Sequence, residues 1–259
     1  MIRLFIKIYL KSRSIISFIR LKLMLAFNIS MKKYCYACDK KVPNFYFLSY
    51  RPYGCPHCKS SPRERFVMYC FKNGLLPVLS KGMRVLHVAP SERNIKKYFC
   101  SNSDWIGGDI NPNRYENDVI YLDLIKMDID SFFDLIYASH VLEHILDDQK
   151  AMQNIYNHLL PGGIAIILVP LLGEITQEGE ANLSPKERHK RFGQYDHVRQ
   201  YGMDIIDRLK NVGFSVNVID AGNIESYKIE KYRFETHGYL GNEEYDRIFL
   251  CHRPLESSK

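Results

Sequence analysis

Apolar runs alternate with amphipathic segments from about residue 80 to the end of the chain. The apolar runs have the length and flanking residues of strands, and they cover 83–89, 104–109, 118–123, 133–139, 164–170, 214–220 and 246–252. Between them, residues 91–100, 147–160 and 203–213 have a helical pattern. Because strands and helices alternate with short links, we predict an α/β domain over residues 80–259, with a doubly wound, mostly parallel sheet.

Residues 1–33 form a separate pattern, which is that of a basic amphipathic helix. They contain eight Lys or Arg and no acidic residue, whereas the other 226 residues contain 28 basic and 29 acidic side chains and are nearly neutral. Charges interrupt every apolar stretch, so a transmembrane span is not expected. A small-residue cleavage site is also missing, which argues against a secretory signal.

Three interpretations of this helix stay open. It can lie on an anionic membrane surface, bind nucleic acid as a basic arm, or dock on its own protein with a solvated basic face. Its content of Ile, Leu and Phe makes nucleic acid the least favoured of the three.

Four cysteines in two Cys-x-x-Cys pairs predict a zinc ribbon over residues 34–66. Sixteen residues separate the pairs, a spacing typical of zinc sites. Four thiolates close a tetrahedron around Zn²⁺ and leave no open position, so this metal is expected to be structural. The alternatives are a redox dithiol or chance pairing. The ligands are Cys35, Cys38, Cys55 and Cys58.

The other three cysteines are Cys70, Cys100 and Cys251. Unpaired thiols beside a zinc-thiolate site suit a reducing compartment. We therefore expect a cytoplasmic protein, peripheral at the membrane if residues 1–33 bind there.

Polar residues follow the first four predicted strands of the α/β domain. In such sheets, ligands bind outside the carboxyl ends of the strands, where the strand order reverses. Asp109 follows the second strand, where a carboxylate can accept hydrogen bonds from both hydroxyls of a nucleoside ribose. Asp123 repeats this position one strand later. A turn or capping role is the alternative for each, but two aspartates in successive positions are more specific than one.

Four longer segments carry a family resemblance. FDLIYASHVLEHILDDQKAMQNIYNHLLPGGIAIILVP resembles the fourth-strand, helix and fifth-strand block of class I S-adenosylmethionine-dependent methyltransferases of the type-11-like group. CPHCKSSPRERF, VLHVAP and FGQYDHVRQYG are similar to segments of a bacterial subgroup with an N-terminal zinc ribbon. The resemblance covers about residues 34–252 and implies a Rossmann-like fold and methyl transfer.

The resemblance also implies roles for individual residues. Asp109 would hold the ribose of S-adenosylmethionine, and Asp123 would reach the adenine amino group beside the backbone of Leu124. Ser139 and His140 would face the methionine and methyl end.

The turn after the first strand departs from the superfamily. His87, Ala89, Ser91 and Arg93 stand where Asp, Gly, Gly and Gly are usual. Glycine permits a close approach of the backbone to a ligand, so the methionine end must be held differently. His87 is a candidate cofactor contact, and Glu92 could bind the cofactor's ammonium group. For Glu92, a first-turn glutamate favoured by the helix dipole is the alternative.

The segment Leu171–Tyr201 follows the fifth strand and is long enough to act as a lid. His197 is a candidate general base, with Asp196 and Arg199 orienting it or binding an anionic acceptor. The alternative is a structural histidine at a lid hinge. His140, Glu143 and His144 have a metal-like spacing, but no further ligand is evident in the sequence. We interpret them as surface or cofactor-shell residues.

These observations predict a methyltransferase that uses S-adenosylmethionine, with a structural Zn²⁺ ribbon. The acceptor is unidentified, and a small molecule, a glycan or a lipid-linked substrate is favoured. One alternative is an RNA methyltransferase that grips phosphates with the ribbon and the basic helix, although the nearly neutral body argues against it. Another is a non-catalytic, cofactor-binding scaffold, which the missing glycine turn suggests.

Overall fold

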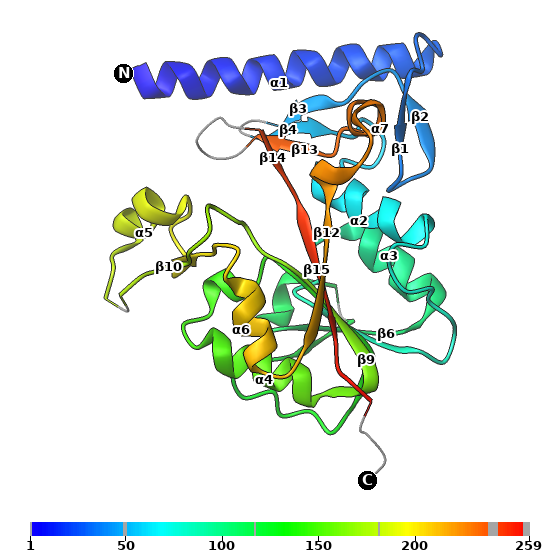
Figure 1. Cartoon of the computed structure of the whole chain (residues 1–259). Coiled ribbons are helices and arrows are strands. Elements are labelled where there is room, and N and C mark those ends of the chain that lie inside the picture. Colours follow the sequence, from blue (N-terminus) through cyan, green and yellow to red (C-terminus); the bar gives the residue numbers. More distant parts are fainter. Residues whose placement is uncertain (1, 49–50, 117, 181, 238–242, 256–259) are drawn as a thin grey trace. The chain divides into compact units, whose positions relative to one another are not determined.

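The structure of the protein is a computed structural model that describes residues 2–48, 51–116, 118–180, 182–237 and 243–255 (Figure 1). The chain folds into two compact units. The first comprises Met1–Val78, Glu92–Ile95 and Asp220–Asp246, and the second comprises Leu79–Ser91, Lys96–Ile219 and Arg247–Lys259.

A seven-stranded sheet forms the centre of the second unit, with the order β12-β15-β9-β8-β5-β6-β7. The five strands from β9 to β7 are parallel neighbours, and β15 pairs with β9 in the antiparallel sense. The predicted α/β fold with a mostly parallel sheet is therefore confirmed. The strands are β5 Arg84–Val88, β6 Asp104–Asp109, β7 Val119–Tyr121, β8 Phe133–Ser139, β9 Leu159–Leu168, β12 Ser215–Asp220 and β15 Arg247–His252.

The strand order reverses between β5 and β8. From β5 the chain moves to β6 and then β7 on one side, and it returns to β8 and β9 on the other side. The carboxyl ends of β5 and β8 therefore flank the position where doubly wound sheets bind their ligands.

Helices α4 (Asp148–Asn157) and α6 (Ile205–Asn211) lie together on one face of the sheet (Figure 1). Ala151, Met152 and Ile155 of α4 are fully buried in the core cluster that also contains residues of β5, β8 and β9. Burial of each large aliphatic side chain contributes about 1.5–3 kcal/mol, so the amphipathic pattern of α4 determines its position.

Helix α3 (Arg93–Asn102) contributes Phe99 to the opposite side of β5. The Phe99 ring lies 5.3 Å from the imidazole of His87 and 5.4 Å from the ring of Tyr137 on β8. Alternate residues of β5 thus face different layers, because Leu86 and Val88 belong to the α4 side.

Two boundaries differ from the sequence prediction. Helix α4 ends at Asn157, whereas the helical pattern continues to residue 160. The segment Leu159–Gly163 belongs to β9 instead, where the pairing with β8 shifts its register and Gly162 takes a φ of 80°. Gly162 and Gly163 therefore lie in an irregular first part of β9.

The long segment after β9 has its own secondary structure. It contains β10 Gln177–Glu178, α5 Pro185–Phe192 and β11 Arg199–Gln200, and β10 pairs with β11. Ser184 and Glu187 form a capping box at the start of α5. Two short 3₁₀ turns, η1 Pro112–Arg114 and η2 Leu142–His144, complete the second unit.

The first unit combines the N-terminal region with residues from the last part of the chain. The N-terminal elements are α1 Ile2–Ala26, β1 Lys33–Cys35, β2 Lys40–Val42, β3 Tyr46–Leu48, β4 Arg51–Gly54 and α2 Pro62–Lys72. The later elements are η3 Ala221–Asn223, α7 Ser226–Tyr232, β13 Glu235–His237 and β14 Glu243–Tyr245. The predicted domain over residues 80–259 is thus divided between the units, because Asp220–Asp246 packs with the cysteine-rich region.

Aromatic rings hold the later elements to the cysteine-rich region. The ring of Tyr232 on α7 lies 4.8 Å from that of Tyr36, and the ring of Phe234 lies 5.1 Å from that of Tyr69 on α2. Each aromatic pair of this kind contributes about 0.5–1.5 kcal/mol beyond its buried area. Within the described residues, no helix, α1 included, is long and apolar enough to cross a membrane.

Candidate functional site

The four predicted zinc ligands lie together in the first unit. All four Sγ atoms are within 4.8 Å of one another, with 3.7 Å between Cys35 and Cys58 and 3.9 Å between Cys38 and Cys55. A tetrahedral zinc site with Zn–S bonds of about 2.3 Å places its sulfurs about 3.8 Å apart. The cysteine positions therefore fit zinc.

Both Cys-x-x-Cys segments have the same backbone turn. The residue after the second cysteine takes a left-handed conformation in each, with φ of 55° at Asp39 and 62° at Lys59. The Ser60 hydroxyl, which is buried, lies 3.4 Å from Cys35 Sγ and 3.2 Å from Cys58 Sγ. Two equivalent turns facing one point are the arrangement that a four-thiolate site requires.

Arg65 on α2 places a fully buried guanidinium in the same unit. It donates to the carbonyl oxygens of Ser60 (2.7 Å), Tyr232 (2.9 Å) and Arg233 (2.6 Å), and it lies over the ring of Phe45. Burial lowers the pKa of Arg65, whereas the nearby cysteine thiolates raise it. A zinc ion with four thiolates carries a net charge of −2, which would offset the cost of burying this cation.

Two residues at the switch point have left-handed backbones although they are not glycines. Ala89, just after β5, has a φ of 49°, and His140, just after β8, has a φ of 54°. The Ala89 amide donates to Gly108 O at 2.8 Å, and the His140 amide donates to Leu168 O at 2.8 Å. Ala89 stands where the superfamily has glycine, so the departure in sequence preserves the backbone conformation that glycine would favour. Such strain clusters at ligand sites.

His87 lies in the aromatic layer beneath α3. Its side chain is 1% exposed, and its ring lies 5.0 Å from that of Tyr137. Burial, together with the charge of Lys96, lowers the pKa of His87 to about 3, so the imidazole is neutral. Its Nδ1 is buried and accepts no hydrogen bond from any described residue. A contact between His87 and the cofactor stays a prediction.

Asp109 ends β6 with a side chain that is 5% exposed. Its Oδ1 accepts from the Asn111 amide at 2.7 Å, and its Oδ2 accepts from the Tyr115 hydroxyl at 2.8 Å. Burial, followed by this hydrogen bond, raises the pKa of Tyr115. Each carboxylate oxygen has two lone pairs, so Asp109 can accept ribose hydroxyls in addition to these donors.

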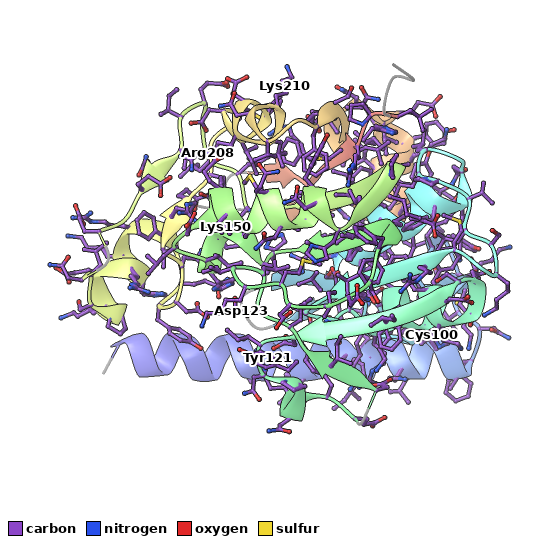
Figure 2. The ribbon with its side chains drawn as sticks, turned by 90° about the horizontal axis from the view of Figure 1, so that it is seen from below. Cys100, Tyr121, Asp123, Lys150, Arg208 and Lys210 are labelled. Carbon is purple, nitrogen blue, oxygen red and sulfur yellow. The ribbon has the colours of Figure 1, made fainter. Side chains whose placement is uncertain are left out.

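Asp123 is brought next to the end of β6 by close packing. Leu122 N donates to Asp109 O at 2.9 Å, and a Cβ on Gly108 would lie 2.5 Å from the Leu122 side chain. A glycine at 108 is therefore required for this approach. Figure 2 labels Asp123 on the segment that leaves β7, where its Oδ1 accepts from the Ile125 amide at 2.9 Å. Leu124 is buried, and its carbonyl accepts from Asn154 on α4 at 2.8 Å.

Glu92 belongs to the first unit and not to the sheet unit. Its carboxylate forms an ion pair with Arg63 Nε at 3.0 Å, and both side chains are largely buried. A contact with the cofactor's ammonium group stays a prediction. Ser139, the half-buried last residue of β8, also keeps its cofactor role as a prediction.

Asp196 and His197 lie between α5 and β11, and Arg199 is the first residue of β11. His197 is 3% exposed, with Nδ1 3.0 Å from Phe192 O. The Arg199 guanidinium, also 3% exposed, donates to Glu178 Oε2 (3.0 Å), Leu142 O (3.2 Å), Leu146 O (2.8 Å) and Ile145 O. Binding of an acceptor by Arg199 stays a prediction, and it would require some of these contacts to break.

The structure adds an arrangement that the sequence did not reveal. Glu143 and His144 on η2 lie beside His197, with one ligand atom of each within 4.8 Å of the others. The signal in the sequence was the metal-like spacing of His140, Glu143 and His144. The third member comes from a distant segment, so no local pattern could identify it.

Comparisons with known proteins agree with this description. The family model described as a methyltransferase domain matches residues 74–217, more than half of the chain. The comparison with curated proteins gives no significant match.

One similar solved structure is phosphoethanolamine N-methyltransferase 2 of Haemonchus contortus in complex with S-adenosyl-L-methionine. Its sequence is 14% identical to this chain, and the TM-score is 0.47. The match covers 72% of this chain and 52% of that one. This chain thus spans about half the length of that enzyme. An S-adenosylmethionine-dependent methyltransferase from Clostridium acetobutylicum is also 14% identical, with a TM-score of 0.42 and coverage of 73% of this chain and 89% of that one.

The family match covers the strands from β5 to β9, which carry the switch point and both predicted cofactor aspartates. The chain therefore belongs to the class I S-adenosylmethionine-dependent methyltransferases.

Proposed function

We propose that this protein transfers a methyl group from S-adenosylmethionine to an acceptor bound at the carboxyl edge of the sheet. The observation that carries the proposal is the position of Asp109 and Asp123 at the carboxyl ends of adjacent parallel strands, joined by the Leu122–Asp109 backbone bond. The bound cofactor supplies a sulfonium-activated methyl group. The protein's own contribution is alignment of donor and acceptor, an effect worth about 7–11 kcal/mol at most.

Different residues would bind different parts of the cofactor. Asp109 would accept the ribose hydroxyls, and Asp123 with the Leu124 backbone would bind the adenine. Ser139 and His140 would face the methionine and methyl end. The left-handed Ala89 favours an enzyme over a scaffold that has lost its cofactor site, because the turn keeps its conformation without its glycine.

Calorimetric titration with S-adenosylmethionine tests this proposal. Asp109→Ala should weaken binding about tenfold to a hundredfold, because hydrogen bonds to a charged group contribute about 1.5–3 kcal/mol. Asp128→Ala is the matched control, since Asp128 is an exposed aspartate of the same unit. An unchanged dissociation constant for Asp109→Ala, with an intact fold, would refute the ribose role.

The second part of the proposal is a structural Zn²⁺ bound by Cys35, Cys38, Cys55 and Cys58. The sulfur spacing and the paired left-handed turns support it. A closed four-thiolate site would stabilise the first unit and take no part in methyl transfer.

The acceptor is proposed to be a small molecule, a glycan or a lipid-linked substrate. Near neutrality outside residues 1–33 supports this over RNA. His197 would act as general base through Nε2, because its Nδ1 faces Phe192 O. Asp196 supports the site through His144, whose Nδ1 lies 3.5 Å from Asp196 Oδ2.

We also propose that α1 attaches the protein to an anionic membrane surface. One face of α1 docks within the first unit, where Leu21 is buried, Leu25 packs beside the cysteines and the Phe18 ring lies 4.9 Å from that of Tyr46. Another face leaves an apolar stripe at four-residue spacing, Ile15, Ile19 and Leu23, with exposed fractions of 51%, 53% and 56%. Phe27, just after the helix, is 72% exposed.

Basic side chains accompany the exposed apolar stripe. Arg20 and Lys22 are exposed on the same helix. A cavity of about 420 Å³ in the first unit is lined by Lys32, Lys33, Lys41 and Lys231 together with three tyrosines. Apolar insertion combined with basic residues favours an anionic membrane surface over nucleic acid.

Vesicle binding tests the attachment. Because Leu21 and Leu25 are packed, truncation would damage the fold, so the variant is Ile15→Ser/Ile19→Ser/Leu23→Ser in the full chain. Its binding to anionic vesicles should fall at least tenfold, and wild-type binding should weaken with salt. Equal binding by variant and wild type would eliminate the membrane proposal, and strong RNA binding without vesicle binding would favour an RNA acceptor.

A further inference from the structure

Glu143, His144 and His197 bring two imidazoles and a carboxylate together in the second unit. The three ligand atoms lie within 4.8 Å of one another, and the rings of His144 and His197 are 4.8 Å apart at centroid and nearly perpendicular. Atoms at this separation can reach one metal ion with modest movement, since metal–nitrogen and metal–oxygen bonds are about 2.0–2.2 Å.

The backbone holds the two contributing segments in register. Val198 N donates to Glu143 O at 2.9 Å, and Arg199 donates to the carbonyls of Leu142 and Leu146 on either side of the Glu143–His144 pair. The buried guanidinium therefore fixes η2 against the segment that carries His197.

Each of the three side chains has an outer contact of the kind that metal ligands have. His197 Nδ1 lies 3.0 Å from Phe192 O, and His144 Nδ1 lies 3.5 Å from Asp196 Oδ2. Glu143 Oε1 lies 3.3 Å from His140 Nδ1. Oxygen acceptors on one ring nitrogen orient a histidine and make its other nitrogen a better ligand.

Burial also favours a cation. Glu143 is fully buried, and His197 is 3% exposed, whereas the His144 side chain is 33% exposed. Positive charge stabilises a carboxylate that is removed from water. An ion bound by all three groups would add positive charge beside Glu143, and its open position would face solvent on the His144 side.

We propose that Glu143, His144 and His197 bind one divalent first-row transition cation, with Zn²⁺ as the representative ion. Two imidazoles with one carboxylate suit Zn²⁺ or Fe²⁺ better than Mg²⁺ or Ca²⁺, which prefer oxygen ligands. Three protein ligands leave a coordination position open, unlike the four-thiolate ribbon site.

The site begins three residues beyond His140, close to the proposed methyl end. Resting on the proposed function, the open position would hold an oxygen or nitrogen of the acceptor and lower its pKa. A metal on His197 would replace the general-base role of that residue.

Metal content of the full-length protein tests this inference. After equilibration with Zn²⁺ and removal of loosely bound ions, wild type should hold two ions per chain. His144→Ala, Glu143→Gln and His197→Gln should each hold one. His189→Gln, a control at an exposed position on α5 of the same unit, should hold two. His144→Ala keeps the test valid if the buried variants fail to fold.

Cobalt substitution separates the two sites, because only the ribbon's thiolates give an intense charge-transfer band. His144→Ala should keep this band and lose one cobalt. A single ion in wild type, or two ions retained in His144→Ala, would overturn the inference. Titration of His144→Ala with S-adenosylmethionine separates this failure from failure of the proposed function, since cofactor binding should be unchanged.

Discussion

At the scale of single residues, Ala89 carries backbone strain that a glycine would relieve. The left-handed conformation costs an alanine about 1–2 kcal/mol relative to a right-handed one. Glycine avoids this cost, but its larger loss of backbone entropy on folding costs about 0.5–1 kcal/mol relative to alanine. We therefore predict that Ala89→Gly raises the free energy of unfolding by about 0.5–1 kcal/mol, measured with denaturant. Ala151→Gly, in the interior of α4, should lower the free energy of unfolding by about 1 kcal/mol from helix propensity and by about 0.8 kcal/mol more from the loss of a buried methyl group. If Ala89→Gly and Ala151→Gly lowered the free energy of unfolding equally, the backbone of Ala89 would not be strained.

His87 should make the sheet unit sensitive to acid. Its folded pKa of about 3 lies below the unfolded value of about 6.5, so the unfolded chain binds a proton first as pH falls. The contribution of neutral His87 to the free energy of unfolding is fully present above pH 6.5 and is lost as the pH falls toward 3. We expect a loss of about 2 kcal/mol between pH 6.5 and 5.

His87→Gln should remove this part of the pH dependence, whereas His158→Gln should retain it. The chain contains a single tryptophan, Trp105 on β6, whose fluorescence reports the sheet unit during unfolding. Equal slopes of stability against pH in wild type and His87→Gln would show that the imidazole is not buried in its neutral form.

At the scale of elements, a buried ion network joins the segment after β9 to the start of α4. Asp148 Oδ2 accepts from the Tyr201 hydroxyl at 2.6 Å and from Arg208 Nη1 at 3.0 Å, with Arg199 Nε 3.6 Å away. Burial, followed by the Asp148 charge, raises the pKa of Tyr201. Figure 2 labels Arg208 on α6 and Lys150 on α4, the two helices that this network joins.

Removal of Asp148 should release this segment. Asp148→Ala removes the buried carboxylate of this network and leaves Glu178 as the anion paired with Arg199 and Arg208, so a loss of up to about 3–5 kcal/mol and faster proteolysis within residues 171–201 are expected. Asp147→Ala is the control, because Asp147 only caps α4 through the Lys150 amide and should cost about 1 kcal/mol. Matching proteolysis patterns in the two variants would argue against the network.

At the scale of the whole molecule, zinc should stabilise residues far beyond the ribbon. Arg65 links the cysteine region to the carbonyls of Tyr232 and Arg233. Cys38→Ser should therefore cut metal content and increase amide hydrogen exchange in both 34–66 and 221–237, since metal binding is coupled to folding.

The sheet strands β5 and β8 should keep their protection, because they belong to the other unit. Cys100→Ser, at an exposed cysteine outside the cluster, should change neither metal content nor exchange. Full zinc retention in Cys38→Ser would refute the four-thiolate assignment.

Local patterns in the sequence were sufficient to predict the sheet and the cluster of four cysteines. Short runs of apolar residues predicted β5, β6, β8 and β9, because a strand that is buried on both faces has apolar residues at consecutive positions. The two Cys-x-x-Cys pairs predicted one cluster, because each pair is a single turn. Asp109 and Asp123 were predicted to follow successive strands, and the structure places them after the adjacent parallel strands β6 and β7.

Tertiary structure alone decided the features that join distant segments. The grouping of Asp220–Asp246 with the cysteine region, the carbonyl partners of Arg65 and the approach of His197 to Glu143 and His144 all depend on packing between residues far apart in the chain. The spacing of apolar and polar residues along the chain does not indicate such contacts. The left-handed backbone of Ala89 was equally hidden, because alanine has no local preference for that conformation and the surrounding strands impose it.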